Sequence, residues 1–105
     1  MTGVQTCALP ISSFAPTATT FLTALPTIST NIILPTTGTP TIAYVTNTDD
    51  FWIYVSLGTS SVTASETTSI PIPPRGQLPL TIGTNTYIAA ISLEKPVGVN
   101  ITVGN

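Results

Sequence analysis

The stretch Phe51-Trp-Ile-Tyr-Val-Ser-Leu57 decides the fold class of this chain. It consists of aromatic and β-branched residues, which favour strands over helices. In a strand, successive side chains point to opposite faces of the sheet. The odd-numbered residues of this stretch therefore share one face, which we expect to enter the core. Trp52 and Tyr54 lie on the other face.

Large side chains occupy both faces of this strand, so a sheet with one buried and one solvated face does not explain it. We expect Trp52 and Tyr54 to be covered by the N-terminal segment or to meet a neighbouring subunit, because Trp and Tyr combine a large apolar body with one polar group. Plain core packing is the alternative. Phe14, Phe21 and Tyr87 are the further aromatic candidates for such an interface.

Six other segments alternate in polarity or combine apolar residues with strand-edge prolines, and they are separated by turns rich in Gly, Pro, Asn and Asp. They span residues 28–34, 41–47, 70–74, 78–82, 87–93 and 97–103. The last has the cleanest alternation, with Val97, Val99, Ile101 and Val103 on one face. Ten prolines and few helix-forming residues exclude long helices. The sequence therefore predicts an all-β protein, in which residues 28–105 form an antiparallel β-sandwich or jelly roll of seven or eight short strands.

The first 27 residues are expected to lie outside this sandwich. Residues 1–11 resemble the translation of a sequencing adapter, and we interpret them as an artefact, which removes Cys7 from any chemical argument. A short secretory signal is the alternative, but it would need a basic start and a longer apolar run. Residues 12–27 predict an extended N-terminal arm, either lying along a neighbouring subunit or forming a disordered tail.

The chain is unusually poor in charge. Charged residues make up 6%, there is no histidine, the net charge is −2, and the mean hydropathy is +0.46. An ordinary soluble domain has about 25% charged residues. Such a surface favours coverage by other copies of the chain or by a larger assembly, and a secreted, hydroxyl-rich surface is the alternative. Two cations are too few for nucleic-acid binding, and no apolar run reaches the ~20 residues of a membrane span.

Residues able to perform catalysis are scarce. There is no histidine for proton transfer and, without Cys7, no thiol nucleophile. Asp49 and Asp50 are adjacent and follow Asn47, a pattern that could serve calcium binding or glycoside hydrolysis. A solvated turn is favoured, because calcium needs six or more oxygen ligands. We therefore expect no enzymatic activity, no metal site and no cofactor.

Several short sequence words occur in a recognisable order. They are Tyr44-Val-Thr-Asn47, the segment 53–64 with Gly-Thr-Ser-Ser-Val-Thr, Ser69-Ile-Pro-Ile-Pro-Pro-Arg-Gly76, Thr86-Tyr-Ile-Ala-Ala-Ile91 and Val99-Asn-Ile-Thr-Val-Gly104. In this order the chain resembles small virion proteins of tailed bacteriophages. It departs from them at Tyr87, where His is usual, and at Pro74, where a small residue is usual.

The resemblance implies a β-sandwich with a structural role in the virion, most plausibly decorating or cementing the capsid surface. The implied partners are the major capsid protein and copies of the chain itself, with a homotrimer expected at a site of local threefold symmetry. A tail, neck or fibre component is the alternative. A carbohydrate-binding sandwich is a further alternative, in which Trp52, Tyr54 and Tyr87 would form a stacking platform on an open sheet face.

Overall fold

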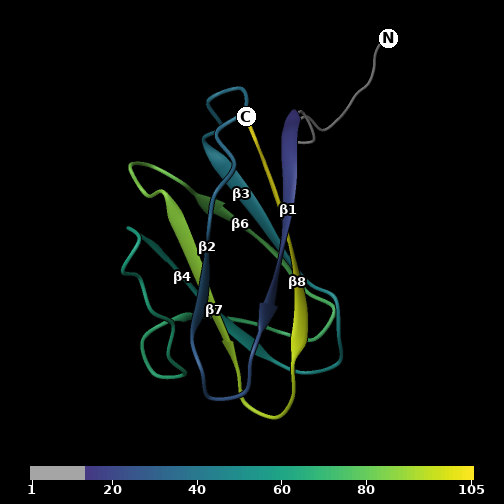
Figure 1. Cartoon of the computed structure of the whole chain (residues 1–105). Coiled ribbons are helices and arrows are strands. Elements are labelled where there is room, and N and C mark those ends of the chain that lie inside the picture. The colour runs from purple at the N-terminus through teal and green to yellow at the C-terminus, as the bar shows by residue number, and fades with distance from the viewer. Residues whose placement is uncertain (1–13) are drawn as a thin grey trace, which may run out of the picture.

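The computed structural model describes residues 14–105 of the chain. These residues contain eight strands, joined by turns and loops, and no helix (Figure 1). The interpretation of residues 1–11 as an artefact therefore falls outside the described residues. The strands are β1 (Pro16–Ala24), β2 (Thr30–Ile33), β3 (Ile42–Asn47), β4 (Ile53–Gly58), β5 (Ile70–Ile72), β6 (Gln77–Thr81), β7 (Tyr87–Ser92) and β8 (Val97–Gly104).

The strands form two four-stranded antiparallel sheets, with the orders β1-β8-β3-β6 and β2-β7-β4-β5. Every pair along the chain from the two ends inward is hydrogen-bonded: β1 with β8, β2 with β7, β3 with β6 and β4 with β5. The chain is thus one long hairpin rolled into two layers, and β3–β8 and β4–β7 pairs close the roll. This order is that of an eight-stranded jelly roll, so the predicted fold class is confirmed.

The core lies between the two sheets and follows the predicted alternation. In β4, Ile53 and Val55 are fully buried, and in β8 the four odd-numbered residues from Val97 to Val103 are fully buried. Phe51, two residues before β4, and Leu57, near its end, pack against the same core. The apolar residues at alternate positions therefore provide the driving force that holds the layers together.

The structure corrects the prediction that residues 12–27 form an arm outside the sandwich. Residues 16–24, expected to lie outside the sandwich, form β1, which pairs with β8 in the chain's own sheet. Leu22 and Ala24 point into the core and are buried, and the backbones of Ala15 and Asn105 exchange hydrogen bonds of 2.8 and 3.1 Å. Pairing satisfies the backbone of this Thr-rich segment and covers the edge that β8 would otherwise expose. The sandwich therefore includes residues assigned to the arm.

Replacing a core isoleucine should be far more costly than replacing an exposed one. Ile53→Ala removes side-chain atoms from a fully buried position, so we expect a loss of about 2–5 kcal/mol in the free energy of unfolding. Ile33→Ala is the matched control, because Ile33 is 55% exposed. Urea denaturation of both variants measures the difference. Equal losses would contradict the assignment of Ile53 to the core.

The place of β1 in the sandwich is tested by two neighbouring residues. Leu22 is buried while Phe21 is 55% exposed. Leu22→Ala should therefore lower the free energy of unfolding by about 2–5 kcal/mol, whereas Phe21→Ala should change it by less than about 1 kcal/mol. Thermal and urea unfolding, at a concentration at which light scattering shows a monomer, provide the measurement. If Leu22→Ala had no effect, the segment would be an arm outside the domain.

Candidate functional site

Charged residues gather at one end of the sandwich. The β3–β4 turn carries Asp49 and Asp50, the β5–β6 turn carries Arg75, and the β7–β8 turn carries Glu94 and Lys95. These three turns meet, because Arg75 and Lys95 each contact one of the two aspartates. The turn end of the sandwich is therefore the polar end, and the sheets themselves are left poor in charge.

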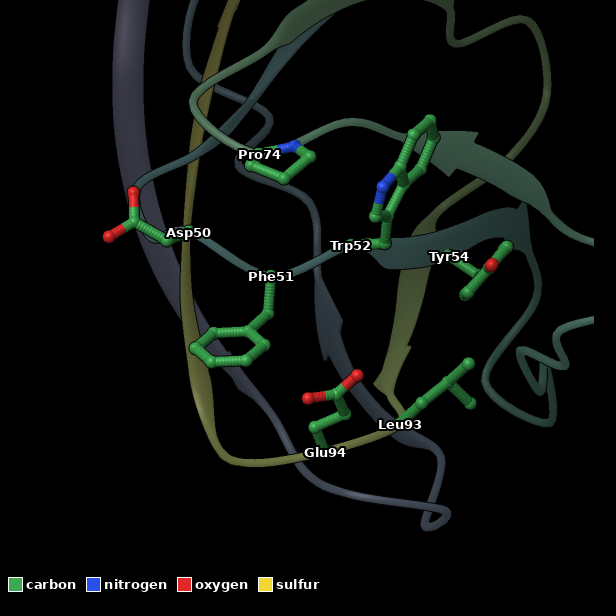
Figure 2. A pocket seen from close by; sticks show the side chains of 7 residues that line it. All are labelled: Asp50, Phe51, Trp52, Tyr54, Pro74, Leu93 and Glu94. Atoms are coloured by element: carbon green, nitrogen blue, oxygen red, sulfur yellow. The ribbon is translucent and has the colours of Figure 1, made fainter.

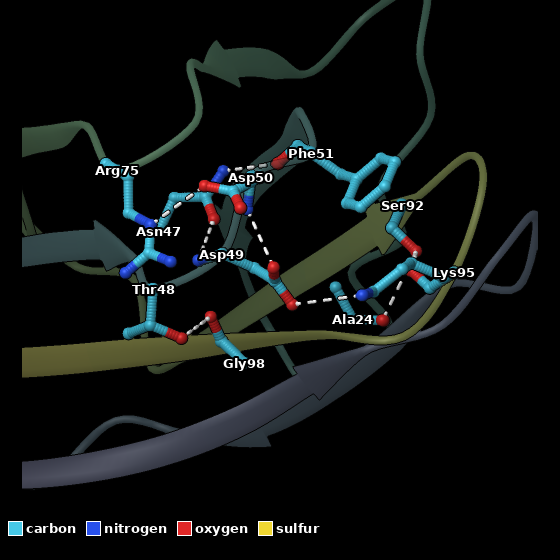
Figure 3. A network of polar contacts seen from close by, with 10 residues as sticks. All are labelled: Ala24, Asn47, Thr48, Asp49, Asp50, Phe51, Arg75, Ser92, Lys95 and Gly98. Atoms are coloured by element: carbon cyan, nitrogen blue, oxygen red, sulfur yellow. Dashed lines mark hydrogen bonds and ion pairs between the residues drawn. The ribbon is translucent and has the colours of Figure 1, made fainter.

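Asn47 organises the β3–β4 turn from a buried position (Figure 3). Its Nδ2 donates hydrogen bonds to the carbonyl oxygens of Phe51, at 2.6 Å, and of Ile72, at 3.4 Å. Its Oδ1 accepts a hydrogen bond of 3.0 Å from the backbone N–H of Asp49. The amide thus serves the backbone, in agreement with a turn built by Asn. Among residues 14–105, no three Asp, Glu, His or Cys side chains are grouped so that they could hold a metal ion.

The two cations of the chain both pair with this turn. Arg75 Nε lies 3.0 Å from Asp50 Oδ1, and Lys95 Nζ lies 3.8 Å from Asp49 Oδ2. Lys95 Nζ also lies 4.9 Å from the centre of the Phe51 ring (Figure 3). These pairs are exposed, so each contributes only about 0–1 kcal/mol to stability. Their main consequence is that each aspartate has a cation beside it.

The β5–β6 connection shapes the neighbouring surface. Gly76 N–H donates a 2.9 Å hydrogen bond to the Pro73 carbonyl, and Arg75 adopts a positive φ of 60°. Pro74 at the second position and a positive φ at the third describe a type II turn. The Arg75 N–H donates to the Asp49 carbonyl at 3.0 Å, which joins this turn to the β3–β4 turn. The departure at Pro74 therefore falls on a turn position that proline favours.

A groove of about 490 Å³ opens beside these turns (Figure 2). Its lining consists of Asp50, Phe51, Trp52, Tyr54, Pro74, Leu93 and Glu94. Trp52 is 49% exposed, which contradicts plain core packing for this residue. The described part of the N-terminal segment does not cover Trp52 and Tyr54 either, because β1 belongs to the opposite sheet. The structure thus places both aromatic residues in one open groove at the charged end of the molecule.

The loop between β4 and β5, residues 59–69, packs on the outer side of the β2-β7-β4-β5 sheet, and we call it the covering loop. Ala64 of this loop packs with Ala89 and Ile91 of β7, and Tyr54 and Val62 lie against them. Hydrogen bonds hold the loop, among them Ala64 N–H to Ser29 Oγ at 2.8 Å and Ser56 Oγ to Ser69 Oγ at 2.6 Å. The apolar side chains Val62 and Ala64 within a Ser- and Thr-rich stretch are the signal that could have revealed this cover.

The other aromatic candidates are dispersed. Tyr87 lies opposite Gly58, whereas Tyr54 lies opposite Ile91, so the two tyrosines are separated by four residues along the sheet, on the order of 13 Å. The prediction of a single platform of Trp52, Tyr54 and Tyr87 is therefore wrong. Tyr87 lies at the far end of that face and does not line the groove. Phe14 packs edge-on against Tyr44, with ring centres 4.4 Å apart, on the other sheet.

A second surface lies on the outer side of the other sheet. None of the eight strands carries a charged residue, so the two sheets are alike in this respect, but the loop with Val62 and Ala64 packs on the β2-β7-β4-β5 sheet alone. We call the outward side of the β1-β8-β3-β6 sheet the threonine face; it comprises Thr19, Phe21, Thr23, Tyr44, Thr46, Gln77, Pro79, Gly98, Asn100 and Thr102. Its side chains bond to one another: Thr19 with Thr102 at 3.2 Å, Thr102 with Asn100 at 3.1 Å, and Gln77 with Thr46 at 3.2 Å. Phe21 is exposed within it.

Comparison with protein-family models, with curated proteins and with solved structures finds no match to this chain. In residues 14–105 there is also no helix long and apolar enough to cross a membrane. The evidence for function is therefore the geometry of the groove and of the threonine face, together with the sequence words described above.

The role of Asn47 can be measured against another asparagine. Asn47→Ala leaves backbone groups at the turn without their buried partner, so we expect a loss of about 1–3 kcal/mol in the free energy of unfolding. Asn85→Ala, in the turn between β6 and β7, is the matched control and should lose less than about 1 kcal/mol. Urea denaturation followed by Trp52 fluorescence gives both values. Similar losses at the two positions would contradict a specific turn-holding role for Asn47.

Proposed function

We propose that this chain is a non-enzymatic structural protein of a tailed-phage particle, which decorates or cements the capsid surface. It does so by binding copies of itself, as a homotrimer, and the major capsid protein. The observation that carries the proposal is the threonine face, a whole sheet surface without a charged residue and with Phe21 exposed on it.

The chemistry of the threonine face suits burial against another protein surface. Interface cores are depleted of charged residues and enriched in aromatic ones. Desolvating hydroxyl and amide groups costs much less than desolvating charges, particularly when those groups already bond to one another as Thr19 and Thr102 do. A free monomer relies on surface charge for solubility, which this face lacks. A protein partner bound to the threonine face would remove this uncharged surface from water.

Two further observations support the proposal. The jelly roll is a fold used by viral capsid proteins, although a fold by itself does not establish a function. The sequence words of the phage resemblance coincide with strands, because Tyr44–Asn47 lies in β3 and residues 99–104 lie in β8. A tail, neck or fibre role would use the same face, so the head location rests on the resemblance alone.

Charge placed on the threonine face should prevent assembly without unfolding the chain. Phe21 and Asn100 lie opposite each other in the β1–β8 pair. We expect the full chain to have the mass of a trimer in light scattering, and the double variant Phe21→Lys/Asn100→Lys to have the mass of a monomer. The free energy of unfolding of the monomeric variant, measured by circular dichroism, shows that the fold is kept.

The matched control is Ser61→Lys/Thr68→Lys, which adds the same charge at exposed positions of the covering loop. This control should retain the trimer. A wild-type chain that stays monomeric at all concentrations, and that does not co-sediment with capsids assembled from the major capsid protein of the same genome, would contradict the proposal. Co-sedimentation with purified tails in place of capsids would favour the tail alternative.

A further inference from the structure

The groove beside the turns exposes a tryptophan, Trp52. Trp52 directly precedes β4 and is 49% exposed, while the next residue, Ile53, is fully buried. Tyr54, Leu93 and Pro74 line the same groove (Figure 2). The half-exposed indole and its apolar neighbours thus form one contiguous surface in contact with water, and contiguous surfaces of this kind mark ligand or partner sites.

Two carboxylates lie at the border of this aromatic surface. Asp50 already accepts a hydrogen bond from Arg75, at 3.0 Å. The Glu94 side chain has neither a hydrogen bond nor an ion pair with any residue in the range 14–105. In the view of Figure 2 the Glu94 carboxylate lies between Phe51 and Leu93, toward the centre of the lining side chains. An ionised carboxylate is a strong acceptor of hydrogen bonds from hydroxyl groups.

The charge of the groove is small and gives no strong preference for a charged ligand. The three acidic residues Asp49, Asp50 and Glu94 stand against the two cations, Arg75 and Lys95, so the turn end carries a net charge of −1. Lys95 already lies over the ring of Phe51. A ligand cation would therefore find both aspartates paired and the Phe51 ring occupied, so that only Glu94 and Trp52 would attract it. An anionic ligand would meet the free Glu94. A neutral ligand with hydroxyl groups meets neither obstacle.

The groove also differs from the threonine face as a surface for self-association. A contact between two copies through this groove would bury the Glu94 carboxylate, and burying a charge without a partner is unfavourable. Its volume of about 490 Å³ falls within the roughly 300–1,000 Å³ of small-molecule sites. Size, charge and lining thus all describe a site for a small neutral molecule.

We propose that this groove binds a pyranose ring of a neutral oligosaccharide. The C–H groups on one face of the ring would stack on the Trp52 indole, whose face is electron-rich. Ring hydroxyl groups would donate hydrogen bonds to Glu94 and to the free oxygen of Asp50. Tyr54, Leu93 and Pro74 would enclose the ring edge. This binding is separate from assembly through the threonine face, which lies on the opposite sheet.

The single tryptophan of the chain makes the test direct, because all tryptophan emission comes from the proposed site. The full chain is titrated with neutral hexasaccharides of glucose, mannose, galactose and N-acetylglucosamine, and with a sialylated oligosaccharide and tetramethylammonium for comparison. Binding is followed by fluorescence and, independently, by calorimetry. We expect at least one neutral hexasaccharide to shift the emission to shorter wavelength and to bind more tightly than both comparison compounds.

Variants assign the binding to the groove. Trp52→Ala should weaken binding measured by calorimetry at least about tenfold, which corresponds to the loss of one stacking contact. Trp52→Phe should retain part of it, and Glu94→Gln should weaken it by a smaller factor because an amide oxygen is a poorer acceptor than a carboxylate. Two controls should bind as the wild type does: Glu66→Gln, in the covering loop, and Tyr87→Ala, at the far end of the sheet.

Three results would overturn the proposal. The first is that no neutral hexasaccharide binds at millimolar concentration to the folded chain. The second is that tetramethylammonium or the sialylated compound binds more tightly than every neutral one. The third is that Trp52→Ala lowers the mass of the assembly in light scattering, which would make the groove a contact between copies. Loss of the trimer in the threonine-face variant with sugar binding intact would separate the two functions.

Discussion

Strand β8 is the element on which the rest of the structure depends. It pairs with β1 on one side and β3 on the other, and every second residue from Val97 to Val103 is fully buried. The strand lies at the C-terminal end of the printed chain, and its partner β1 lies near the other end. The sheet β1-β8-β3-β6 can therefore close only when distant parts of the chain meet. Without β8, β1 would have no neighbour in its sheet, and β3 would keep only β6.

The rolled hairpin also separates polar and apolar surfaces. Because consecutive strands run in opposite directions, the β3–β4, β5–β6 and β7–β8 turns come to the same end, and they bring five of the six charged residues with them. The sixth, Glu66, lies in the loop between β4 and β5. The two surfaces considered for function follow from this arrangement. The threonine face is the outer side of the β1-β8-β3-β6 sheet, whose strands contain no charged residue. The groove lies where the charged turns meet exposed aromatic residues.

Asn47 connects the charged turns to the core of the sandwich. Its position at the end of β3 buries its side chain, and its three hydrogen bonds hold the backbone that leads into Phe51 and Trp52. The β3–β4 turn is in turn joined to the β5–β6 turn through Arg75. The position of Trp52 in the groove therefore depends on buried polar contacts below it as well as on the strand that follows it.

Alternation along the chain was enough to predict the fold class, the approximate extent of β2 to β8 and the buried faces of β4 and β8, because a period of two residues assigns each side chain to one face of a strand. Residues 16–24 could not be assigned in this way. Their Thr-rich pattern is compatible with a free arm, and only the pairing of β1 with β8 makes them part of the sheet. The same holds for the site. Trp52, Tyr54 and Tyr87 share a sheet face, but the covering loop and the length of the strands separate Tyr87 from the groove. Asp50, Pro74 and Glu94 reach the groove from three different turns, and contacts between turns are a property of the folded chain that local sequence patterns do not encode.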